Sequence, residues 1–387
     1  MSDASPNVAV IGGGAVGTST LFHLADRHDV TGILFERGQL GSGSTGKAAG
    51  GVRNLFTNPA NVAVGNRAIK YFHNFVDETG EELEFRQNGY MYVYHSATAA
   101  SRWRERAERF RTHGVNARLL SPAEAVNRFP LLNPDPISGA LYGPDCGHVD
   151  PHMLTQAFAR AADDRGATVH TGTAVTDVLV EDGSVVAVES EAGTFSVDAV
   201  VDAAGPWAAR IAETVGIRVP LDLSIRRIMV TSEVPNAAGP LMIDSERSCY
   251  VQAEQNGSLL VCDTGQDIHN VEDSDTTGER RVGYDYYLAA TETVSELVPS
   301  LTDLTVINGW SGLQSHTPDG NAIVGPTEVD GFYLACGFSG HGVQQSPCVG
   351  GAVADLIVTG RTNWLNPAPF APGRFDGGGS EFIEEMA

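Results

Sequence analysis

A glycine-rich turn between an apolar run and a helical run constrains this chain more than any other stretch. Residues 8–20 have the sequence VAVIGGGAVGTST, with a G-x-G-x-x-G pattern formed by Gly12, Gly14 and Gly17. In such a pattern the glycines permit a tight turn, a close approach of the backbone to a phosphate, and close packing of the helix on the strand. We therefore expect a βαβ unit whose helix N-terminus binds the pyrophosphate of a dinucleotide.

The acidic residue after the next apolar run supports this interpretation. The run GILFER at 32–37 predicts a second strand, and Glu36 lies 19 residues after Gly17. A carboxylate at that place accepts hydrogen bonds from ribose hydroxyls and disfavours a 2′-phosphate, so NADP is disfavoured. The motif does not separate NAD from FAD, because both carry the same ADP half.

The charge balance excludes some partners. The formal net charge is −23 over 387 residues, and the two lysines are Lys47 and Lys70. An acidic, lysine-poor surface suits a protein in concentrated salt, where screening reduces self-repulsion. We expect a halophilic, salt-adapted cytoplasmic protein. No basic stripe is present that would favour nucleic acid.

The cysteines and the hydropathy point to a reducing compartment. The five cysteines are scattered and contain no Cys-x-x-Cys pair, which argues against a disulfide framework or a zinc site, and we expect no metal. No run reaches membrane-spanning length, and the N-terminus MSDASPN lacks the basic and apolar parts of a signal peptide.

The pattern of predicted elements favours an α/β fold with two interleaved domains. We expect helices over 59–79, 150–166 and 279–298, and a hairpin at Asn256-Gly257. The segment 43–56 is predicted to become helical after its glycines and serines. The fold class is α/β with an α+β substrate domain: a Rossmann-like nucleotide-binding domain is interleaved with an antiparallel-sheet domain. The first takes residues 1–87, 146–222 and 312–370, the second takes 88–145 and 223–311, and 371–387 is predicted to be a flexible tail.

Three further glycine clusters favour a flavin over a nicotinamide. They are GSGSTGKAAGGVR at 41–53, AVVDAAGPWAARI at 199–211, and the stretch 317–357, which contains TPDGNAIVG and GFSGHGV. The last cluster leads directly into a helix and so places a second positive helix terminus in the protein. Two helix N-termini suit FAD, with one at the pyrophosphate and one at the N1/C2=O edge of the ring, where it favours the anionic reduced flavin.

The chain resembles the D-amino-acid oxidase/sarcosine oxidase/glycine oxidase family of FAD enzymes in the order of five motifs. They are the glycine motif, SGSTGKAAGGVR, VVDAAGPWA, TPDGNAIVG and GFSGHGV. The resemblance spans about residues 7–360. It implies a discontinuous FAD domain and a substrate domain whose antiparallel sheet covers the flavin. The residues that it assigns to the ADP and pyrophosphate are Gly12, Gly14, Gly17, Glu36, Arg37, Ser44 and Thr45, with Val175 on the adenine side and Gly205 and Trp207 after the central strand. Further cofactor-binding candidates are Ala15, Val16 and, in the flavin-facing loop, Lys47. Those that it assigns to the flavin ring are Gly337, Gly340, His341, Gly342, Val343 and Gln344.

Two departures from the family pattern bear on cofactor attachment and specificity. Gln344 stands where single-chain sarcosine oxidases have a lysine, and Gly312 stands where they have the cysteine that binds flavin covalently. The resemblance with these departures implies noncovalent FAD and no strict specificity for sarcosine.

Four residues are the catalytic candidates: Arg53, Lys47, His341 and Tyr250. Arg53 matches the arginine that grips the substrate carboxylate in sarcosine oxidases; the alternative is a structural arginine at a helix cap or an FAD phosphate. Lys47 is a candidate for contact with the cofactor or with oxygen. His341 is a candidate for acid–base catalysis, or for a contact made by its backbone alone. Tyr250 is a candidate for a position on the substrate sheet facing the flavin. His316 is a weaker pocket candidate, and Arg226, Arg227 and Arg247 are weaker candidates for binding an acidic substrate.

The predicted function is FAD-dependent oxidation of the C–N bond of a small amino acid or N-methyl amino acid, by hydride transfer to flavin N5. The electron acceptor is oxygen or another molecule, and homo- and hetero-oligomers both stay open. Three alternatives remain: an FAD-dependent 2-hydroxy acid dehydrogenase, a flavoprotein subunit or assembly factor with little turnover of its own, and an NAD enzyme.

Overall fold

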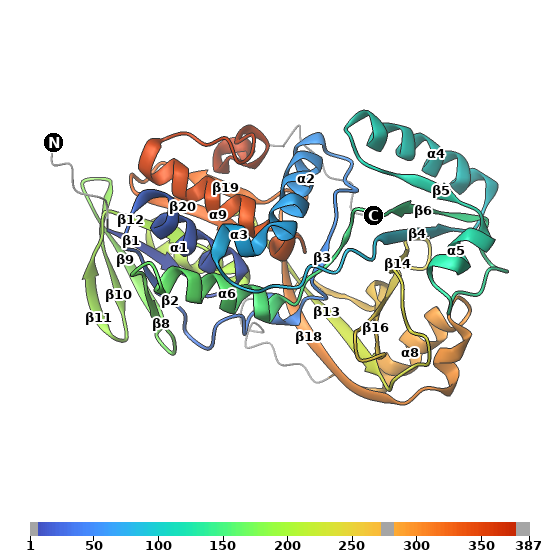
Figure 1. The fold of residues 1–387 in the computed structure, drawn as a ribbon. Helices are drawn as coiled ribbons and strands as arrows, with labels where there is room; N and C mark the ends of the chain where they lie inside the picture. The colour runs from blue at the N-terminus through green and yellow to red at the C-terminus, as the bar shows by residue number, and fades with distance from the viewer. Residues whose placement is uncertain (1–6, 272–281, 377–387) are drawn as a thin grey trace.

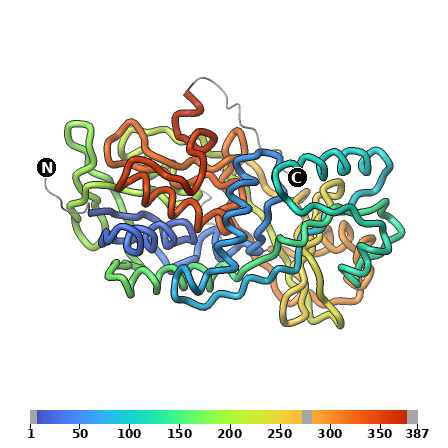
Figure 2. Tube along the Cα trace, turned by 45° about the horizontal axis from the view of Figure 1, so that its top comes forward, coloured from blue at the N-terminus to red at the C-terminus, as the bar shows by residue number. Residues whose placement is uncertain are grey.

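The chain folds into two halves, each built on its own large sheet (Figure 1). The computed structural model describes residues 7–271 and 282–376. Figure 2, the turned view, shows the blue N-terminal segment and the red C-terminal segment together in one half, while the teal and gold segments form the other. The predicted α/β class with interleaved segments is confirmed.

The first half is centred on a six-stranded sheet with the order β19-β20-β12-β1-β2-β8. Neighbouring strands from β20 to β8 run parallel, and β19 runs antiparallel to β20. The strands are β1 (Val8–Ile11), β2 (Ile33–Phe35), β8 (Thr168–His170), β12 (Ala199–Asp202), β19 (Ile323–Pro326) and β20 (Phe332–Cys336). Because parallel strands are buried on both faces, β1 is a continuous apolar run, and β12 is one up to Asp202 at its end.

Helices cover one face of this sheet and a small sheet covers the other. The first face packs against α1 (Ala15–His28), α6 (Pro151–Asp163) and α9 (Gly342–Thr359), and α2 (Pro59–His73) lies against α9. The second face packs against α7 (Ala208–Thr214) and a three-stranded sheet, whose strands are β9 (Val175–Glu181), β10 (Ser184–Ser190) and β11 (Gly193–Ser196).

The second half is centred on a nine-stranded sheet with the order β17-β13-β16-β15-β14-β4-β6-β5, in which β18 also pairs with β13. Its strands are β4 (Tyr90–Tyr94), β5 (Arg118–Leu120), β6 (Gly139–Gly143), β13 (Asp222–Thr231), β14 (Leu241–Asp244), β15 (Cys249–Ala253), β16 (Leu259–Asp263), β17 (Ile268–His269) and β18 (Val306–His316). The helices α4 (Ala97–Thr112), α5 (Pro122–Arg128) and α8 (Tyr284–Ser295) lie over it. A two-stranded ribbon, β3 (Gly51–Val52) with β7 (Gly147–His148), lies near the junction of the halves.

Several sequence-based predictions are confirmed because local chemistry decides them. The carboxylate of Asp150 accepts hydrogen bonds from the backbone N–H groups of His152 and Met153, so it caps α6 as expected. The hairpin at Asn256-Gly257 joins antiparallel β15 and β16. The helix predicted over 59–79 forms as α2 and α3 (Phe75–Thr79), with a break at Asn74.

Two predicted segments differ from the structure. The stretch 43–56 is not helical beyond a single 3-10 turn at Thr45–Lys47, because Gly50 adopts a φ of +74° and the next two residues pair with β7 as β3. The predicted flexible tail begins too early, since Arg374 forms a buried ion pair with Asp319 at 2.8 Å. Residues 377–387 of that tail lie outside the described part of the chain, as do residues 279–281 of the helix predicted over 279–298.

The two domains share strands at their junction. The predicted boundaries at 222/223 and 311/312 fall within or at the end of β13 and β18, which pair along ten residues from Asp222↔His316 to Thr231↔Val306. The exact boundaries stay a prediction.

One buried acid in the first half makes stability depend on pH. Asp202, the last residue of β12, is fully buried; its Oδ1 accepts a hydrogen bond from Ala204 N, and its Oδ2 has no partner among the described residues. Burial raises the pKa of Asp202 to about 8. The folded chain therefore holds this proton up to higher pH than the unfolded chain, so stability is lost as the pH rises from about 4 to about 8.

Replacing Asp202 with asparagine should stabilise the protein at pH 8. The amide would keep the acceptor for Ala204 N but would never ionise, so we expect a gain on the order of a few kcal/mol in the free energy of unfolding at pH 8, shrinking toward pH 4. Denaturation at both pH values measures the gain, and Asp163→Asn on the exposed surface of α6 is the control, expected to change little. Equal stabilities of the Asp202→Asn variant and the wild type at pH 8 would contradict the burial argument.

Candidate active site

A cavity of about 1290 Å³ is lined by residues from both sheets. Its lining runs from the β1–α1 turn at Gly12 to the β14–β15 turn at Ser248. Pockets for small molecules usually measure about 300–1,000 Å³. This cavity therefore has room for a dinucleotide and a small substrate together.

The β1–α1 turn at one end needs glycine for close packing. Gly12 has a φ of +110°, and a Cβ there would lie 2.5 Å from the carbonyl oxygen of Ala203 on the neighbouring strand. A Cβ at Gly17 would lie 1.9 Å from the carbonyl oxygen of Gly12, so α1 can approach β1 only without a side chain there. The predicted roles of the first and third glycines in the motif match this geometry.

Side chains from two segments close around this turn. Glu36 accepts hydrogen bonds from Gly13 N at 2.8 Å and Gly38 N at 2.7 Å. The Thr45 hydroxyl accepts one from Ala15 N at 3.2 Å, in the first turn of α1. The predicted ADP and pyrophosphate residues that line the cavity are Gly12, Gly14, Val16, Glu36, Arg37, Ser44, Thr45, Lys47, Val175, Gly205 and Trp207, whereas Ala15 and Gly17 lie behind it.

An arginine stacked on a tryptophan forms one wall at this end. The guanidinium of Arg37 lies 3.9 Å from the ring centroid of Trp207, and both residues line the cavity. Trp207 Nε1 is buried and has no hydrogen-bond partner among the described residues. Such an unpaired buried donor is costly and is consistent with a missing ligand acceptor.

The N-terminus of α9 lies against the other part of the cavity. The loop before it places Gly337, Ser339 and Gly340 in the left-handed region, with φ of +67°, +50° and +88°. Gly340, His341, Gly342, Val343 and Gln344 line the cavity as predicted, whereas Gly337 does not; a Cβ there would meet Thr317 at 2.6 Å. The α9 helix has 18 residues and, within the described chain, no side-chain cap at His341, so its first N–H groups and its positive dipole end favour negative charge nearby.

The nine-stranded sheet presents one face to the cavity. Its cross-strand neighbours Tyr92, Ile243 and Tyr250, from β4, β14 and β15, all line the cavity. Farther along the sheet, Ile228 and Arg226 of β13 line it too. This face is largely aromatic and aliphatic, and Tyr250 lies on it.

Arg53 follows β3 and is held from several sides. Its Nη1 donates to the carbonyl oxygen of Leu55 at 3.1 Å and to the Tyr92 hydroxyl, and its Nη2 lies 3.1 Å from His341 Nε2. Its backbone N–H donates to Gln344 Oε1 at 2.9 Å, and its guanidinium lies 4.6 Å from the Phe56 ring centroid. The contact between β3 and the first turn of α9 thus brings together two residues that are 291 positions apart.

Lys47 lines the cavity and packs directly against β18. Its carbonyl oxygen accepts a hydrogen bond from Trp310 Nε1 at 3.0 Å, and the Ser44 hydroxyl donates to the carbonyl oxygen of Leu313 at 2.6 Å. A Cβ at Gly312 would lie 2.5 Å from the Cβ of Lys47. The absence of a side chain at Gly312 is therefore what lets the 44–47 turn pack on β18.

Of the remaining candidate residues, some line the cavity and others lie outside it. Arg226 lines the cavity, where its Nε and Nη2 donate to Asp267 Oδ2 at 3.0 and 2.8 Å. His316 also lines it, with Nε2 2.8 Å from the Ser224 hydroxyl, and burial lowers its pKa. Arg227 is on the opposite face of β13, stacked over Tyr286.

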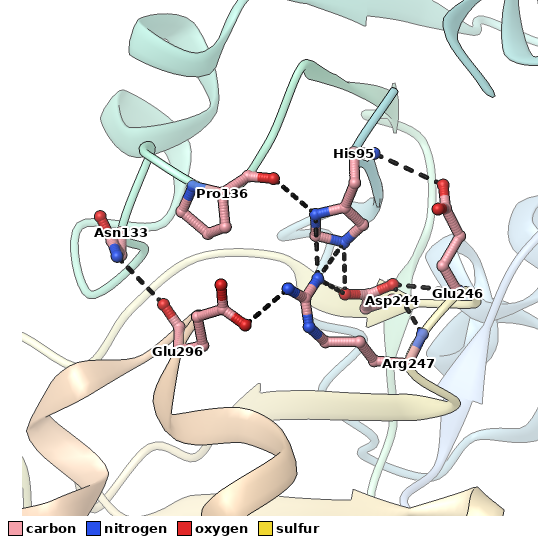
Figure 3. A network of polar contacts seen from close by, with 7 residues as sticks. All are labelled: His95, Asn133, Pro136, Asp244, Glu246, Arg247 and Glu296. Carbon is pink, nitrogen blue, oxygen red and sulfur yellow. Dashed lines mark hydrogen bonds and ion pairs between the residues drawn. The ribbon is translucent and has the colours of Figure 1, made fainter. Parts of the chain in front are cut away.

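Arg247 belongs to a polar network at the far end of the sheet (Figure 3). Its Nη2 donates to Glu296 at 2.6 Å, and its Nη1 donates to the buried carboxylate of Asp244 at 3.1 Å. The His95 ring lies against the same nitrogen and is 2.6 Å from both Asp244 Oδ2 and the carbonyl oxygen of Pro136. These contacts tie the end of β4, the β14–β15 turn and α8 together, which is a structural role.

Sequence reasoning missed many of the cavity residues, and three of them make or lie beside contacts of the predicted residues. Tyr92 contacts Arg53, Asp267 pairs with Arg226, and Gln314 of β18 lines the wall beside Gly340. The alternation of Tyr90, Tyr92 and Tyr94 in GYMYVYH was a usable signal, because alternate residues of a strand share a face. Asp267 and Gln314 carried no local signal, since only strand pairing brings them to the cavity.

Comparison with known proteins decides the family. Residues 7–356 match the family model described as FAD dependent oxidoreductase. The chain belongs to this family. The predicted resemblance and the predicted cofactor, FAD, are confirmed.

The individual relatives carry several enzyme names, and a solved structure among them has the same fold. The chain is 30% identical over 370 residues to sarcosine dehydrogenase, mitochondrial, of Mus musculus, covering 92% of this chain and 40% of that protein. It is 29% identical to glycine oxidase of Geobacillus kaustophilus, covering 94% of this chain and 96% of that protein. L-proline dehydrogenase from P. horikoshii superposes with a TM-score of 0.91 at 28% identity, covering 97% of this chain and 99% of that chain. The chain spans about two fifths of the length of the first curated relatives that it matches.

The residues around the cavity fit FAD. The glycine cradle leaves no room for a Cβ, Trp207 Nε1 is a buried donor without a partner in the described part of the chain, and two helix N-termini line one cavity of sufficient volume. As an FAD-dependent oxidoreductase, the chain would hold the pyrophosphate at α1 and the flavin ring between α9 and the sheet. Within residues 7–271 and 282–376, no His, Cys, Asp and Glu side chains gather into a metal-binding group, and no helix is long and apolar enough to cross a membrane.

Replacing Gly17 with alanine should weaken FAD binding. The added Cβ meets backbone at 1.9 Å, so α1 must move away from β1 and its N–H groups must leave the pyrophosphate. We expect at least about a tenfold rise in the dissociation constant of FAD, equivalent to about 1.4 kcal/mol, by fluorescence titration of the apoprotein. Gly373→Ala, where the added Cβ meets only the end of the Asp376 side chain, is the control; equal affinities of the two variants would refute the packing argument.

Proposed function

We propose that this FAD-dependent oxidoreductase oxidises the carbon–nitrogen bond of a small amino acid or N-methyl amino acid. The observation that carries the proposal is Arg53, a guanidinium in the cavity wall, next to the first turn of α9 and facing an apolar sheet face. Relatives named sarcosine dehydrogenase, glycine oxidase and L-proline dehydrogenase support an amino acid as the substrate.

Arg53 is proposed to bind the substrate carboxylate. A planar guanidinium matches a carboxylate in a bidentate geometry, which fixes both the position and the orientation of a small substrate. Leu55 O, Tyr92 and Phe56, which contact the guanidinium and help to hold it in place, are neutral groups and do not cancel its charge.

The apolar sheet face is proposed to cover the rest of the substrate. Ile228, Ile243 and Tyr250 exclude water from the reacting carbon and favour a neutral amine over an ammonium ion. When bound, FAD would supply the hydride acceptor for the carbon beside the nitrogen. Loss of a hydride from the neutral amine leaves an iminium ion, which hydrolyses after release.

The α9 N-terminus is proposed to stabilise negative charge at the pyrimidine edge of the flavin. Gly342 and Val343 belong to the first turn of the 18-residue helix α9 and line the cavity, at the end of the helix where positive dipole charge is greatest. FAD is proposed to be bound noncovalently, because Gly312 offers no side chain and Lys47 occupies the adjacent space.

The electron acceptor, oxygen or another molecule, and the oligomeric state remain open in this proposal. The net charge of −23 and the scarcity of lysine support a salt-adapted enzyme of the cytoplasm. A 2-hydroxy acid would present the same carboxylate to Arg53, so the first experiment must include that class.

Anaerobic mixing identifies the substrate class. The purified flavoprotein in high salt is mixed with amino, N-methylamino and 2-hydroxy acids, and loss of the visible absorbance of oxidised flavin is recorded. We expect bleaching by amino or N-methylamino acids and none by 2-hydroxy acids. Bleaching by 2-hydroxy acids alone, or by nothing in the panel, would refute the proposed function.

Replacing Arg53 with alanine should raise the apparent KM for the bleaching substrate about 10- to 100-fold. This range corresponds to the loss of hydrogen bonds to a charged group, about 1.5–3 kcal/mol. Arg102→Ala on the exposed face of α4 is the control, with no expected change. An unchanged KM for Arg53→Ala would exclude Arg53 as the carboxylate anchor.

A further inference from the structure

The contacts of His341 show which protonation state its ring must have. His341 Nε2 lies 3.1 Å from Arg53 Nη2. A guanidinium has only donors, so Nε2 must be the acceptor and carry no proton. The neutral ring therefore holds its proton on Nδ1.

The surroundings of His341 favour this neutral form. The ring lies in the cavity wall and is partly buried. Its desolvation lowers the pKa of His341 well below the usual value, and the nearby charges of Arg53, Arg226 and His316 lower it further. The backbone at Phe338 is the group that opposes the shift. The Phe56 ring packs against His341 edge-on at 5.0 Å and also lies under the Arg53 guanidinium, so it fixes both side chains at once.

These contacts conflict with an acid–base role for His341. A ring that accepts from Arg53 through Nε2 would break that contact by taking up a proton there, and a cation would then face a cation. We propose that His341 is a positioning residue: as a neutral acceptor it sets the orientation of Arg53 for the substrate carboxylate, and it transfers no proton in the reaction. This inference rests on the proposed function of Arg53.

Tyr92 acts in the same way from the opposite side. Its hydroxyl accepts from Arg53 Nη1, whereas His341 accepts from Nη2. The two acceptors come from β4 of the second half and from the cap of α9 in the first half. The orientation of Arg53 therefore depends on the two halves being correctly docked.

The test compares His341→Leu with His341→Gln in the FAD-loaded protein. Leucine removes the acceptor, whereas glutamine keeps a neutral one. The probe is acetate, a carboxylate without an amine, and its dissociation constant is measured from the perturbation of the flavin spectrum. We expect about a tenfold weaker affinity for His341→Leu, and an affinity within about threefold of wild type for His341→Gln.

Steady-state kinetics distinguish a positioning role from a merely structural one, because only the positioning role changes KM while kcat stays nearly constant. With the substrate found by anaerobic mixing, His341→Leu should raise KM, leave kcat within about threefold, and leave the shape of the kcat–pH profile unchanged. Tyr92→Phe should raise KM in the same way. The control is His113→Gln, which removes an exposed histidine at the end of α4, outside the cavity lining, and which should leave acetate affinity unchanged.

The outcomes separate failure of this inference from failure of the proposed function. If Arg53→Ala weakens acetate binding and His341→Leu does not, His341 does not position Arg53 and the inference is wrong. Loss of one limb of the kcat–pH profile in both His341 variants would show proton transfer and would also overturn it. If Arg53→Ala binds acetate like the wild type, the carboxylate anchor itself fails.

Discussion

Two helix N-termini that line one cavity are the constraint on which the rest of this structure depends. α1 begins directly after β1, and α9 begins after β20, and both helices pack against each other on the same face of the six-stranded sheet. Each start requires glycines, because Gly17 touches the backbone of Gly12 and Gly340 adopts a φ of +88°. The positive ends of both helices then favour negative charge in one place, which suits a dinucleotide that carries a pyrophosphate at one end and an electron-accepting ring at the other.

Charged side chains of both signs line the cavity. The chain has 48 acidic and 25 basic residues. The cavity wall includes the cations Arg37, Lys47, Arg53, Arg210 and Arg226 together with the carboxylates of Glu36, Asp222, Asp244 and Asp267. Arg226 is matched by Asp267, and Arg37 is stacked on Trp207. Arg53 donates hydrogen bonds to the Leu55 carbonyl oxygen and the Tyr92 hydroxyl, and its Nη2 lies against His341 Nε2, beside the first turn of α9.

The predictable part of the fold was encoded in short stretches. The βαβ unit, the Asp150 cap and the hairpin at Asn256-Gly257 follow from local backbone chemistry, and each is where the pattern indicates. The prediction that 43–56 becomes helical was wrong, because the path of this segment is set by pairing with β7 and by packing on β18 at Gly312. Arg374 was predicted to lie in a flexible tail from its local sequence, which carries no sign of its partner, Asp319, 55 residues away.

The site was predictable where a family motif covered it and unpredictable where strand register decided it. Arg53, Lys47, Tyr250 and His341 all line the cavity as expected, but nothing in the sequence linked Arg53 to Tyr92 or placed Asp267 beside Arg226. Such contacts depend on the pairing of β4 with β14 and on the packing of both halves around the cavity.

A crystal structure of the FAD-loaded protein with bound acetate tests the central claim most directly. The account predicts the pyrophosphate at the N-terminus of α1, the pyrimidine edge of the flavin ring at Gly342 and Val343, and the carboxylate on Arg53 between the ring and Tyr250. A flavin ring bound away from the α9 N-terminus, or a carboxylate bound away from Arg53, would contradict it.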